Sequence, residues 1–597
     1  MTRLKPTHAV LLIVLTLTLG FYLPALFNGF TKWDDPFLIL ENPAVRSLSA
    51  QNIASFFRQS TDVQPFIPLT MITFAVEYHF FGDNPFVYHL NNVLLHLGVV
   101  ALIYVLALRM KLSVPAAGLA ALFFGLHPVH VESVAWAAER KDVLCAVFYL
   151  GAVLFYLNYR RDRRLQDYIV SLLLAALSML AKPMAVSLPL VLLVFDWWER
   201  GKIRPRDLTN KTAYLAILVP LAAVTYLTWA RNPVSNIFQA PLIWIWGLTF
   251  YIKKFFLPLV LLPHYILPKP VSLAQPEYLS ALLILVLLGW SAFRFRNNRM
   301  MILAFLLYLA SIFFLLPLDD VERAGNFTIA ADRFMYLPSL GFCLWLGHAA
   351  AAMLEKIRVA GDSRRLMTAF VLIGLLTGAL GLKTSQQIRI WKDNLTLWDH
   401  TVRLSPDDFL ALINRGYEKV SRRDVEGGIT DYLTALTLRP ENARAFCVLG
   451  KAYEALEKND IALGCYNRAA RFEPNEACAY VNRGSLLLRL NQPLPALTDL
   501  NRAAKLAPDE AGVENNLAVA YASLGQNQAA LDHFNRAAEL DPFFTDAFLN
   551  RGIFLCQEGK KDRARADFAK TLTLDPAHPH ARRYLAACGA SPESPSP

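Results

Sequence analysis

Long apolar runs fill the first two thirds of this 597-residue chain and constrain its fold more than any other feature. Hydrophobic residues make up 55% of the chain, and its mean hydropathy is +0.33. A soluble protein cannot bury so much apolar surface in its core, so the composition predicts a membrane protein. The last third is polar and evenly mixed. The sequence therefore predicts two parts that meet near residue 390.

We predict about eleven transmembrane helices, because the apolar runs are roughly 15–22 residues long. Their ranges are 8–27, 86–108, 114–131, 143–159, 167–181, 184–198, 213–230, 278–293, 301–317, 335–353 and 366–383. The further stretch 239–262 is interpreted as re-entrant rather than spanning, since its lysines, prolines and tryptophans suit a headgroup boundary. The first run could instead be a cleaved signal peptide, although it lacks a small-residue cleavage site.

Basic residues fall in every second predicted loop, as expected when cytoplasmic loops retain Lys and Arg. An odd number of crossings from a cytoplasmic N-terminus places the last third outside the cytoplasm. The same bias accounts for much of the net charge of +11, so we expect no nucleic-acid partner. The cytoplasmic basic residues include Arg3, Lys5, Arg109, Lys111, Arg160, Arg161, Arg163, Arg164, Arg200, Lys202, Arg204, Arg206, Arg294, Arg296, Arg299, Lys356, Arg358, Arg364 and Arg365.

A 34-residue repeat (440 − 406 = 34) organises the last third, where the spacing of prolines matches the tetratricopeptide period. We predict about five units plus a capping helix over residues 409–588. Residues 391–408 would be a linker and 589–597 a disordered tail. Such an array presents a concave surface to peptides or proteins, although it could also be a spacer or an oligomerisation arm. The prolines are Pro406, Pro440, Pro474, Pro508, Pro542 and Pro576.

The predicted fold class is therefore all-α: a polytopic transmembrane helix bundle over 1–390, followed by a tetratricopeptide-repeat α-solenoid. The chain has seven cysteines. Cys145 and Cys343 lie in predicted spans, and the five in the last third lack metal-ligand spacing. We interpret those five as core residues of helices.

Polar residues gather on the predicted outer face, although charges beside membrane spans are costly. A carboxylate there could accept the proton of a hydroxyl, and cations could hold a leaving phosphate. Because these cations would lie at the interface, they favour a donor on a lipid phosphate over a soluble nucleotide sugar. The candidate acids are Asp34 and Asp35; the candidate cations are Arg140, Lys141, Lys182 and Arg333; the other candidates are His89, His127, His130, Glu132, Glu139 and Tyr336.

Each cluster also has a simpler interpretation. Asp34 and Asp35 could cap a helix, and the stretch 139–142 could be a self-neutralised loop. His127 and His130 are too few to indicate a metal site. No cofactor is therefore predicted, and a divalent metal stays possible without support. Acidic residues at Asp319, Asp320 and Glu322 belong to the same predicted face.

Several strings together resemble a known family. They are WDDP at 33–36, HPVHVESVAWAAERKDVL at 127–144, LAKPMAVSLPLVLLVFDWW at 180–198 and AADRFMYLPSLG at 330–341, followed by the repeats. This combination is similar to the transmembrane-and-tetratricopeptide-repeat family and its bacterial relatives, which resemble protein O-mannosyltransferases of the GT-C fold. The resemblance implies transfer of a hexose, expected to be mannose, from a polyprenyl-phosphate carrier to Ser or Thr of acceptor proteins bound by the repeats.

The same resemblance places the family's acidic catalytic residue at Asp34 or Asp35. We favour Asp34 as the base, because Asp35 precedes Pro36 and is expected in an extended conformation that shapes the loop. Frequent Arg and short loops suggest a bacterial inner membrane with periplasmic repeats; an endoplasmic-reticulum membrane with lumenal repeats is the alternative. A non-catalytic membrane-anchored scaffold is the main competing function. A lipid flippase is disfavoured, because no inverted hydropathy repeat is evident.

Overall fold

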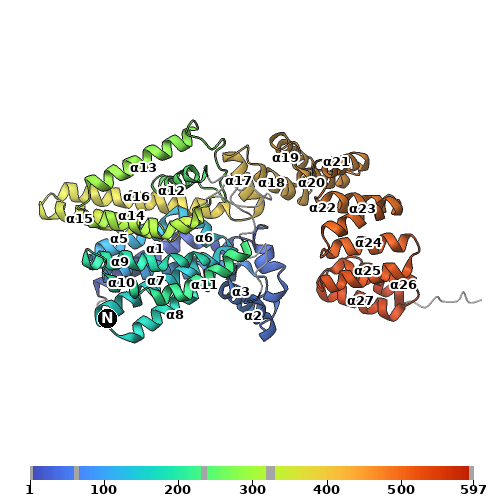
Figure 1. Ribbon diagram of the computed structural model, residues 1–597, viewed down its shortest axis with the longest axis horizontal. Helices are drawn as coiled ribbons and strands as arrows, with labels where there is room; N and C mark the ends of the chain where they lie inside the picture. The colour runs from blue at the N-terminus through green and yellow to red at the C-terminus, as the bar shows by residue number, and fades with distance from the viewer. Residues whose placement is uncertain (1–4, 59–65, 230–237, 317–329, 590–597) are drawn as a thin grey trace, which may run out of the picture. The chain divides into compact units, whose positions relative to one another are not determined.

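The computed structural model describes residues 5–58, 66–229, 238–316 and 330–589. Within these ranges the regular structure is helical, apart from one isolated antiparallel β-bridge between Tyr265 and Ala330. The chain divides into two compact units, Met1–Leu404 and Ser405–Pro597. Figure 1 colours the first from blue to brown and the second from brown to red. The predicted all-helical architecture of two parts is confirmed.

Seventeen α-helices lie in the described residues of the first unit. They are α1 Pro6–Tyr22, α2 Ala50–Phe56, α3 Pro68–Phe81, α4 Pro85–Arg109, α5 Val114–Leu126, α6 Val131–Ala135, α7 Arg140–Asp162, α8 Leu165–Ala181, α9 Leu188–Arg200, α10 Pro205–Thr209, α11 Thr212–Trp229, α12 Ala240–Phe256, α13 Pro276–Arg294, α14 Arg299–Ile312, α15 Leu340–Val359, α16 Ser363–Ile390 and α17 Asn394–Leu404. Short 3-10 turns precede several of them, at Pro128–His130, Ala137–Glu139, Pro183–Ser187 and Asp332–Met335.

Each of the eleven predicted spans contains a helix, but only some of these helices are long enough to cross a bilayer. Among the described residues, six pass by length and apolar composition. A seventh passes if Val114–Leu126 and Pro128–Ala135, which are bent by 52°, count as one span. The six are Pro6–Phe27, Pro85–Arg109, Ala137–Asp162, Pro276–Arg294, Leu340–Val359 and Ser363–Ile390. The chain is thus a multi-pass membrane protein with fewer full-length spans than predicted.

Other predicted spans correspond to shorter helices. Leu165–Ala181 and Arg299–Leu315 are apolar but shorter than the roughly 20 residues typical of a full crossing. Helix α11 has 18 residues and contains Pro220. The predicted span 184–198 is divided between a 3-10 turn and α9, which has only 13 residues. The stretch 239–262 contains α12 and then leaves the helical conformation after Phe256.

Small residues let the central helices of this unit approach closely. A Cβ at Gly347 of α15 would come within 2.4 Å of the Ala120 nitrogen of α5. On the same helix, a Cβ at Gly341 would come within 2.5 Å of the Ala304 carbonyl oxygen of α14. Such contacts hold helices together in a bilayer, where no hydrophobic force drives them together.

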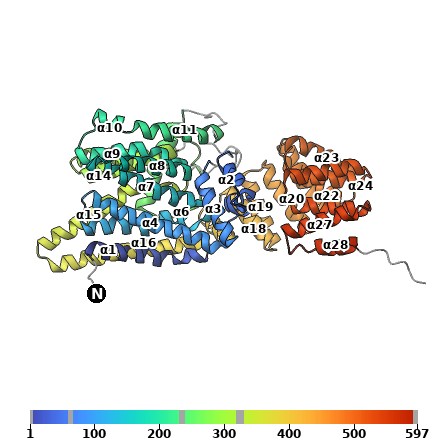
Figure 2. The same cartoon turned by 90° about the horizontal axis from the view of Figure 1, so that it is seen from below.

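Helix α7 connects two charged ends. It lies beside α8 in both views (Figures 1 and 2) and has 23 residues, so it is about 34 Å long. Its first turn carries Arg140, Lys141 and Asp142, and its last turn carries Arg160 and Arg161. This length is close to the hydrocarbon thickness of about 30 Å. The two ends therefore suit opposite faces of a membrane.

Within its described residues, the second unit consists of five helix pairs and a final single helix. The sequence predicts about five units and a capping helix over the same range. A Cβ at Gly450 would come within 2.4 Å of the Tyr466 ring, so glycine is needed where the paired helices meet. The pairs are α18 Phe409–Ser421 with α19 Val425–Leu438, α20 Ala443–Ala455 with α21 Asn459–Phe472, α22 Ala477–Arg489 with α23 Pro493–Leu506, α24 Ala511–Ser523 with α25 Asn527–Leu540, and α26 Thr545–Gln557 with α27 Lys561–Leu574; α28 is Ala581–Gly589.

Two disulfides link neighbouring units of the array, Cys447–Cys478 and Cys556–Cys588. The cysteines do lie in or against the core of the repeats, as interpreted, but four of them also form cross-links that were not predicted; Cys465 is free and buried. Residues 31 and 32 positions apart become neighbours because the first helices of successive repeats stack. Spacing alone did not reveal this, because it was compared only with metal-ligand patterns.

Two further expectations concern the ends of the predicted parts. The predicted linker 391–408 contains α17, which belongs to the first unit and buries Leu397 and Trp398. Residues 590–597 of the predicted tail lie outside the described residues, as do Asp319, Asp320 and Glu322.

Candidate functional site

Asp35 is buried and fully engaged by hydrogen bonds. Its Oδ2 accepts from the Thr31 backbone N–H at 2.6 Å and from the Thr31 hydroxyl at 3.1 Å. Its Oδ1 accepts from the Ala138 N–H at 2.9 Å, which ties the first loop to the turn before α7. The backbone is helical (φ −60°, ψ −38°), so the expected extended conformation is wrong. These hydrogen bonds hold Asp35 in a region that a following proline disfavours.

Asp34 has the opposite environment. Its side chain is 36% exposed, and its Oδ2 lies 3.4 Å from Lys141 Nζ. By contrast, burial raises the pKa of Asp35 to about 7, an effect that its hydrogen bonds only partly oppose. Asp34 is therefore the more accessible carboxylate of the pair.

Glu139 is the centre of a buried ionic cluster. Lys141 Nζ lies 2.9 Å from its Oε1, and Arg333 Nε lies 3.2 Å from the same oxygen. Lys182 Nζ lies 3.3 Å from Oε2 and 2.6 Å from Asp142 Oδ1. Three of the four predicted cations thus converge on one carboxylate. Their side chains are each about a tenth exposed, so their charged ends are held in place without being sealed from the surface.

Arg333 is further held by Glu132. Its guanidinium forms an ion pair with the Glu132 carboxylate, and its backbone N–H donates to Glu132 Oε2 at 2.9 Å. Although burial opposes the charged form, the ion pairs with Glu132 and Glu139 raise the pKa of Arg333 above its usual range. The guanidinium also lies over the Trp136 ring, 5.5 Å from its centre. Arg333 is thus a permanent cation in a fixed position.

The fourth predicted cation, Arg140, lies elsewhere. Its Nε donates to Asn92 Oδ1 at 2.8 Å, its Nη2 donates to the Tyr88 carbonyl at 2.9 Å, and it forms an ion pair with Glu77. Its side chain is only 1% exposed. Arg140 therefore connects α7 to α3 and α4. Glu77 was missed from the sequence, although a lone carboxylate in the apolar segment 68–81 is a recognisable signal.

The predicted histidines and Tyr336 connect elements. His127 Nε2 is bonded to the Phe255 carbonyl at 2.9 Å, and His130 bonds the Phe124 carbonyl and the Ser339 hydroxyl, both at 2.8 Å. His89 Nε2 is bonded to the Gly29 carbonyl at 3.3 Å. Tyr336 OH is bonded to His96 Nδ1 at 2.7 Å. In the described part of the chain, no three His, Cys, Asp or Glu residues are grouped to hold a metal.

Aromatic rings surround the loop that carries Asp34. The centre of the Trp33 ring lies 5.3 Å from those of Trp136 and Trp398 and 5.8 Å from that of His264. Trp136 also stacks on Trp391 at 5.3 Å. Trp391 and Trp398 were not singled out from the sequence, although two tryptophans seven residues apart just after the last apolar run are a detectable signal.

Backbone hydrogen bonds fix the same loop to the end of α16 and the start of α17. The Lys32 N–H donates to Asn394 Oδ1 at 2.7 Å. The Gly29 N–H donates to the Lys392 carbonyl at 2.9 Å. These hydrogen bonds therefore hold the loop that carries Asp34 in place.

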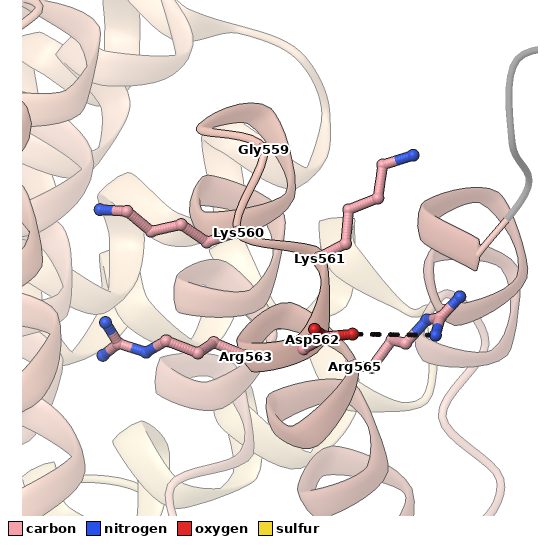
Figure 3. A pocket seen from close by; sticks show the side chains of 6 residues that line it. All are labelled: Gly559, Lys560, Lys561, Asp562, Arg563 and Arg565. Carbon is pink, nitrogen blue, oxygen red and sulfur yellow. Dashed lines mark ion pairs between the residues drawn. The ribbon is translucent and has the colours of Figure 1, made fainter.

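A shallow depression in the last repeat has a different character. It has a volume of about 500 Å³ and is lined by residues 559–563 and Arg565. Figure 3 shows the side chains of Lys560 and Arg563 extending to one side and that of Lys561 to the other, with Arg565 paired with Asp562 at 4.0 Å. The four cations do not converge on one point, and we interpret this surface as a solvated face.

Comparison with protein families assigns two parts of the chain. Residues 63–229 match the family described as dolichyl-phosphate-mannose-protein mannosyltransferase, and residues 511–544 match the tetratricopeptide repeat family. The first match includes Glu132, Glu139, Lys141 and Lys182, and it begins after the loop that carries Asp34.

Individual relatives agree with these matches. The chain is 24% identical over 546 residues to Protein O-mannosyl-transferase TMTC3 of Mus musculus, covering 80% of this chain and 57% of that protein. It is 31% identical over 176 residues to Protein O-mannosyl-transferase TMTC4 of Homo sapiens, covering 26% of this chain and 24% of that protein. The chain thus spans little more than half of the first relative. The predicted resemblance is confirmed as a distant homology.

Among solved structures, the repeats are similar to YrrB, described as a TPR protein with an unusual peptide-binding site. The identity is 25%, and the match covers 31% of this chain and 96% of that chain, with a TM-score of 0.25.

Proposed function

We propose that this chain is a membrane glycosyltransferase that moves a hexose, expected to be mannose, from a polyprenyl-phosphate carrier to a hydroxyl of Ser or Thr. The distant homology to protein O-mannosyl-transferases supports this class of reaction. The observation that carries the proposal is the contrast within one dipeptide. Asp34 is a partly exposed carboxylate beside Lys141, whereas Asp35 is buried and both of its oxygens already accept hydrogen bonds.

Asp34 acts as the general base in this proposal. Its carboxylate accepts the proton of the acceptor hydroxyl as the oxygen attacks the anomeric carbon of the sugar. The bond from that carbon to the phosphate oxygen breaks, and the carrier phosphate leaves with the bonding electrons. Attack from the face opposite the phosphate inverts the anomeric configuration.

Lys141, Lys182 and Arg333 stabilise the leaving phosphate. Ion pairs with Glu139 and Glu132 hold these cations in position before the substrate arrives, which lowers the reorganisation that the reaction requires. Arg140 has no direct role, because its guanidinium is occupied by Glu77, Asn92 and Tyr88.

The proposed location is a bacterial inner membrane with the repeats in the periplasm. Two disulfides in the repeat unit support a non-cytoplasmic position, because disulfides persist in oxidising compartments. The alternation of basic loops supports the same orientation. In this setting the repeats bind the acceptor protein, as expected from the concave surface of such arrays.

Parallel turnover measurements on Asp34→Asn and Asp35→Asn test the proposal. Asparagine keeps the size of Asp34 but cannot accept the proton, so turnover should fall by about 10²–10⁴ with donor affinity nearly unchanged. Asp35→Asn should retain much more turnover in whatever fraction of the protein folds. Near-normal turnover of Asp34→Asn in correctly inserted protein would remove the catalytic assignment and favour a scaffold.

A further inference from the structure

A second buried ionic cluster lies at the opposite end of α7, about 30 Å along the helix from Glu139. Arg160 in the last turn pairs with Asp196 at 3.1 Å and with Asp207 at 2.7 Å. Lys211 pairs with the other oxygen of Asp196 at 2.5 Å. These four side chains are at most 3% exposed. The cluster is separate from the proposed transferase site and joins α7, α9 and α10 to the start of α11.

The cluster carries more positive than negative charge. Arg200 adds a third cation, 2.9 Å from Asp207 Oδ1 and 24% exposed. Three cations and two carboxylates leave a formal charge of +1 (3 − 2 = 1). Burial lowers the pKa of Lys211 to about 8 despite its pairing with Asp196. The two buried cations and the two buried carboxylates balance each other, so the excess positive charge lies on Arg200, the partly exposed member of the cluster.

The same cluster has fewer hydrogen-bond acceptors than donors, although the Tyr156 hydroxyl accepts from Arg160 Nη1 at 3.1 Å and from Lys211 Nζ. Within the described residues, Arg160 Nε and Nη2 are buried and have no hydrogen-bond partner. The amide nitrogen of Asn210, which directly precedes Lys211, is also buried without one. All of these atoms are donors. Buried donors are nearly always satisfied, so an oxygen-rich anion would supply both the missing acceptors and the missing negative charge.

The surrounding loops suit an anion. Exposed basic residues follow Arg160 in the turn 161–164 and precede Asp207 in the turn 201–206, both of which are predicted to be cytoplasmic. An anionic group at this surface would meet a positive field before it reached the buried cations.

We propose that the Arg160 cluster is a binding site for a phosphate anion at the cytoplasmic end of the membrane unit. The phosphate is carried either by the headgroup of an anionic phospholipid or by a free phosphate. Its oxygens accept from the Arg160 guanidinium and offset the charge of Arg200, which shares Asp207 with Arg160. The site is independent of the sugar-transfer reaction and holds whether or not the outer cluster is catalytic.

Thermal unfolding of the full-length protein tests this site in two arms. The first compares nanodiscs of phosphatidylcholine with nanodiscs that also contain phosphatidylglycerol. The second adds inorganic phosphate to the phosphatidylcholine nanodiscs. The unfolding midpoint should rise by a few degrees in at least one arm. A rise with the lipid alone identifies a headgroup site, and a rise with inorganic phosphate identifies a site for free phosphate.

Three variants give the test its specificity. Arg160→Gln should abolish the rise, and Arg160→Lys should abolish it while keeping a cation for Asp196 and Asp207. Because Arg160→Lys preserves the charge, it decides the outcome if Arg160→Gln does not fold. Arg294→Gln, a change at an exposed arginine at the end of α13 and outside the two basic turns, should keep the full rise. An unchanged midpoint for the wild type in both arms, a full rise in Arg160→Lys, or an equal loss in Arg294→Gln would overturn the proposal.

Discussion

Two adjacent aspartates show how strongly burial divides the roles of identical side chains. The sequence predicts the pair as a site and favours Asp34, but it does so partly from an expected backbone conformation that Asp35 does not have. What separates the two residues is the network of contacts. Thr31 and Ala138 donate to Asp35, whereas Asp34 faces Lys141 at the surface.

Asp35 should make the stability of the protein depend on pH. Its pKa of about 7 in the folded state exceeds the value of about 3.9 in an unfolded chain, so the folded protein binds an extra proton between these values. Its contribution is fully present below about pH 4 and is lost as the pH rises through 7. Denaturation between pH 5 and 8 should show the unfolding free energy of the wild type falling more steeply than that of Asp35→Asn.

Asp332 provides the comparison for this measurement. It lies outside the predicted spans, and burial raises its pKa to about 7 as well, so Asp332→Asn should also flatten the slope. Parallel curves for the wild type and Asp35→Asn would contradict the assignment to Asp35.

Neutralising Arg333 should mainly impair use of the lipid donor, whereas neutralising Arg140 should mainly lower stability. Arg333→Gln removes a charge-assisted contact worth about 1.5–3 kcal/mol, so kcat/KM for the lipid donor should fall about 10–150-fold in folded protein. Arg140→Gln leaves Glu77 buried without its ion pair, which costs about 3–5 kcal/mol of stability. Donor kinetics and unfolding midpoints of both variants separate these effects. A similar loss of donor use in well-folded Arg140→Gln would place Arg140 at the substrate.

At the scale of elements, apolar runs predicted the positions of helices better than their extents. Every predicted span contains a helix, because composition determines where the chain avoids water. The lengths could not be predicted as well, since bends such as the 52° angle near His127 depend on tertiary hydrogen bonds. The acid and cation candidates were predictable from their cost in a membrane. The grouping of three cations on Glu139, and the separation of Arg140 from them, depend on helix rotation, which the sequence does not reveal.

Helix α17 should position the loop of the candidate base. Asn394→Ala removes the acceptor for the Lys32 N–H, a contact of about 1 kcal/mol, so kcat should fall roughly 5-fold with little change in donor KM. Asn394→Asp keeps the acceptor oxygen and should restore kcat. Steady-state kinetics of the two variants check the role. If both variants lose kcat equally, or if neither does, the hydrogen bond does not position the loop.

At the scale of the whole molecule, the two units differ in the state of their cysteines. The membrane unit holds free buried Cys145 and Cys343, and the repeat unit holds both disulfides. The 34-residue period was predictable because prolines and small residues recur at that spacing. The disulfides were not predictable from the metal-ligand spacing considered, because only the stacking of successive repeats brings the partners together.

The disulfides provide a direct test of orientation. If the repeats lie outside the cytoplasm, Cys447 and Cys478 should resist alkylation in denatured protein until a reductant is added. Cys465 is the internal control, because it is free and should react on denaturation alone. Mass spectrometry of alkylated peptides from cells lysed in acid distinguishes disulfide-bonded from free cysteines. Immediate alkylation of Cys447 would place the repeats in a reducing compartment.

The anchoring of α7 has a consequence for the bilayer itself. Most spanning helices adapt to a thicker or thinner bilayer by tilting or sliding. Helix α7 is held to its neighbours by buried ion pairs at both ends, through Asp142 at one and Arg160 at the other. Sliding α7 past these neighbours would break one set of ion pairs or the other. We therefore expect a mismatch in bilayer thickness to be met by tilting of the whole bundle or by the surrounding lipids, rather than by movement of α7 alone.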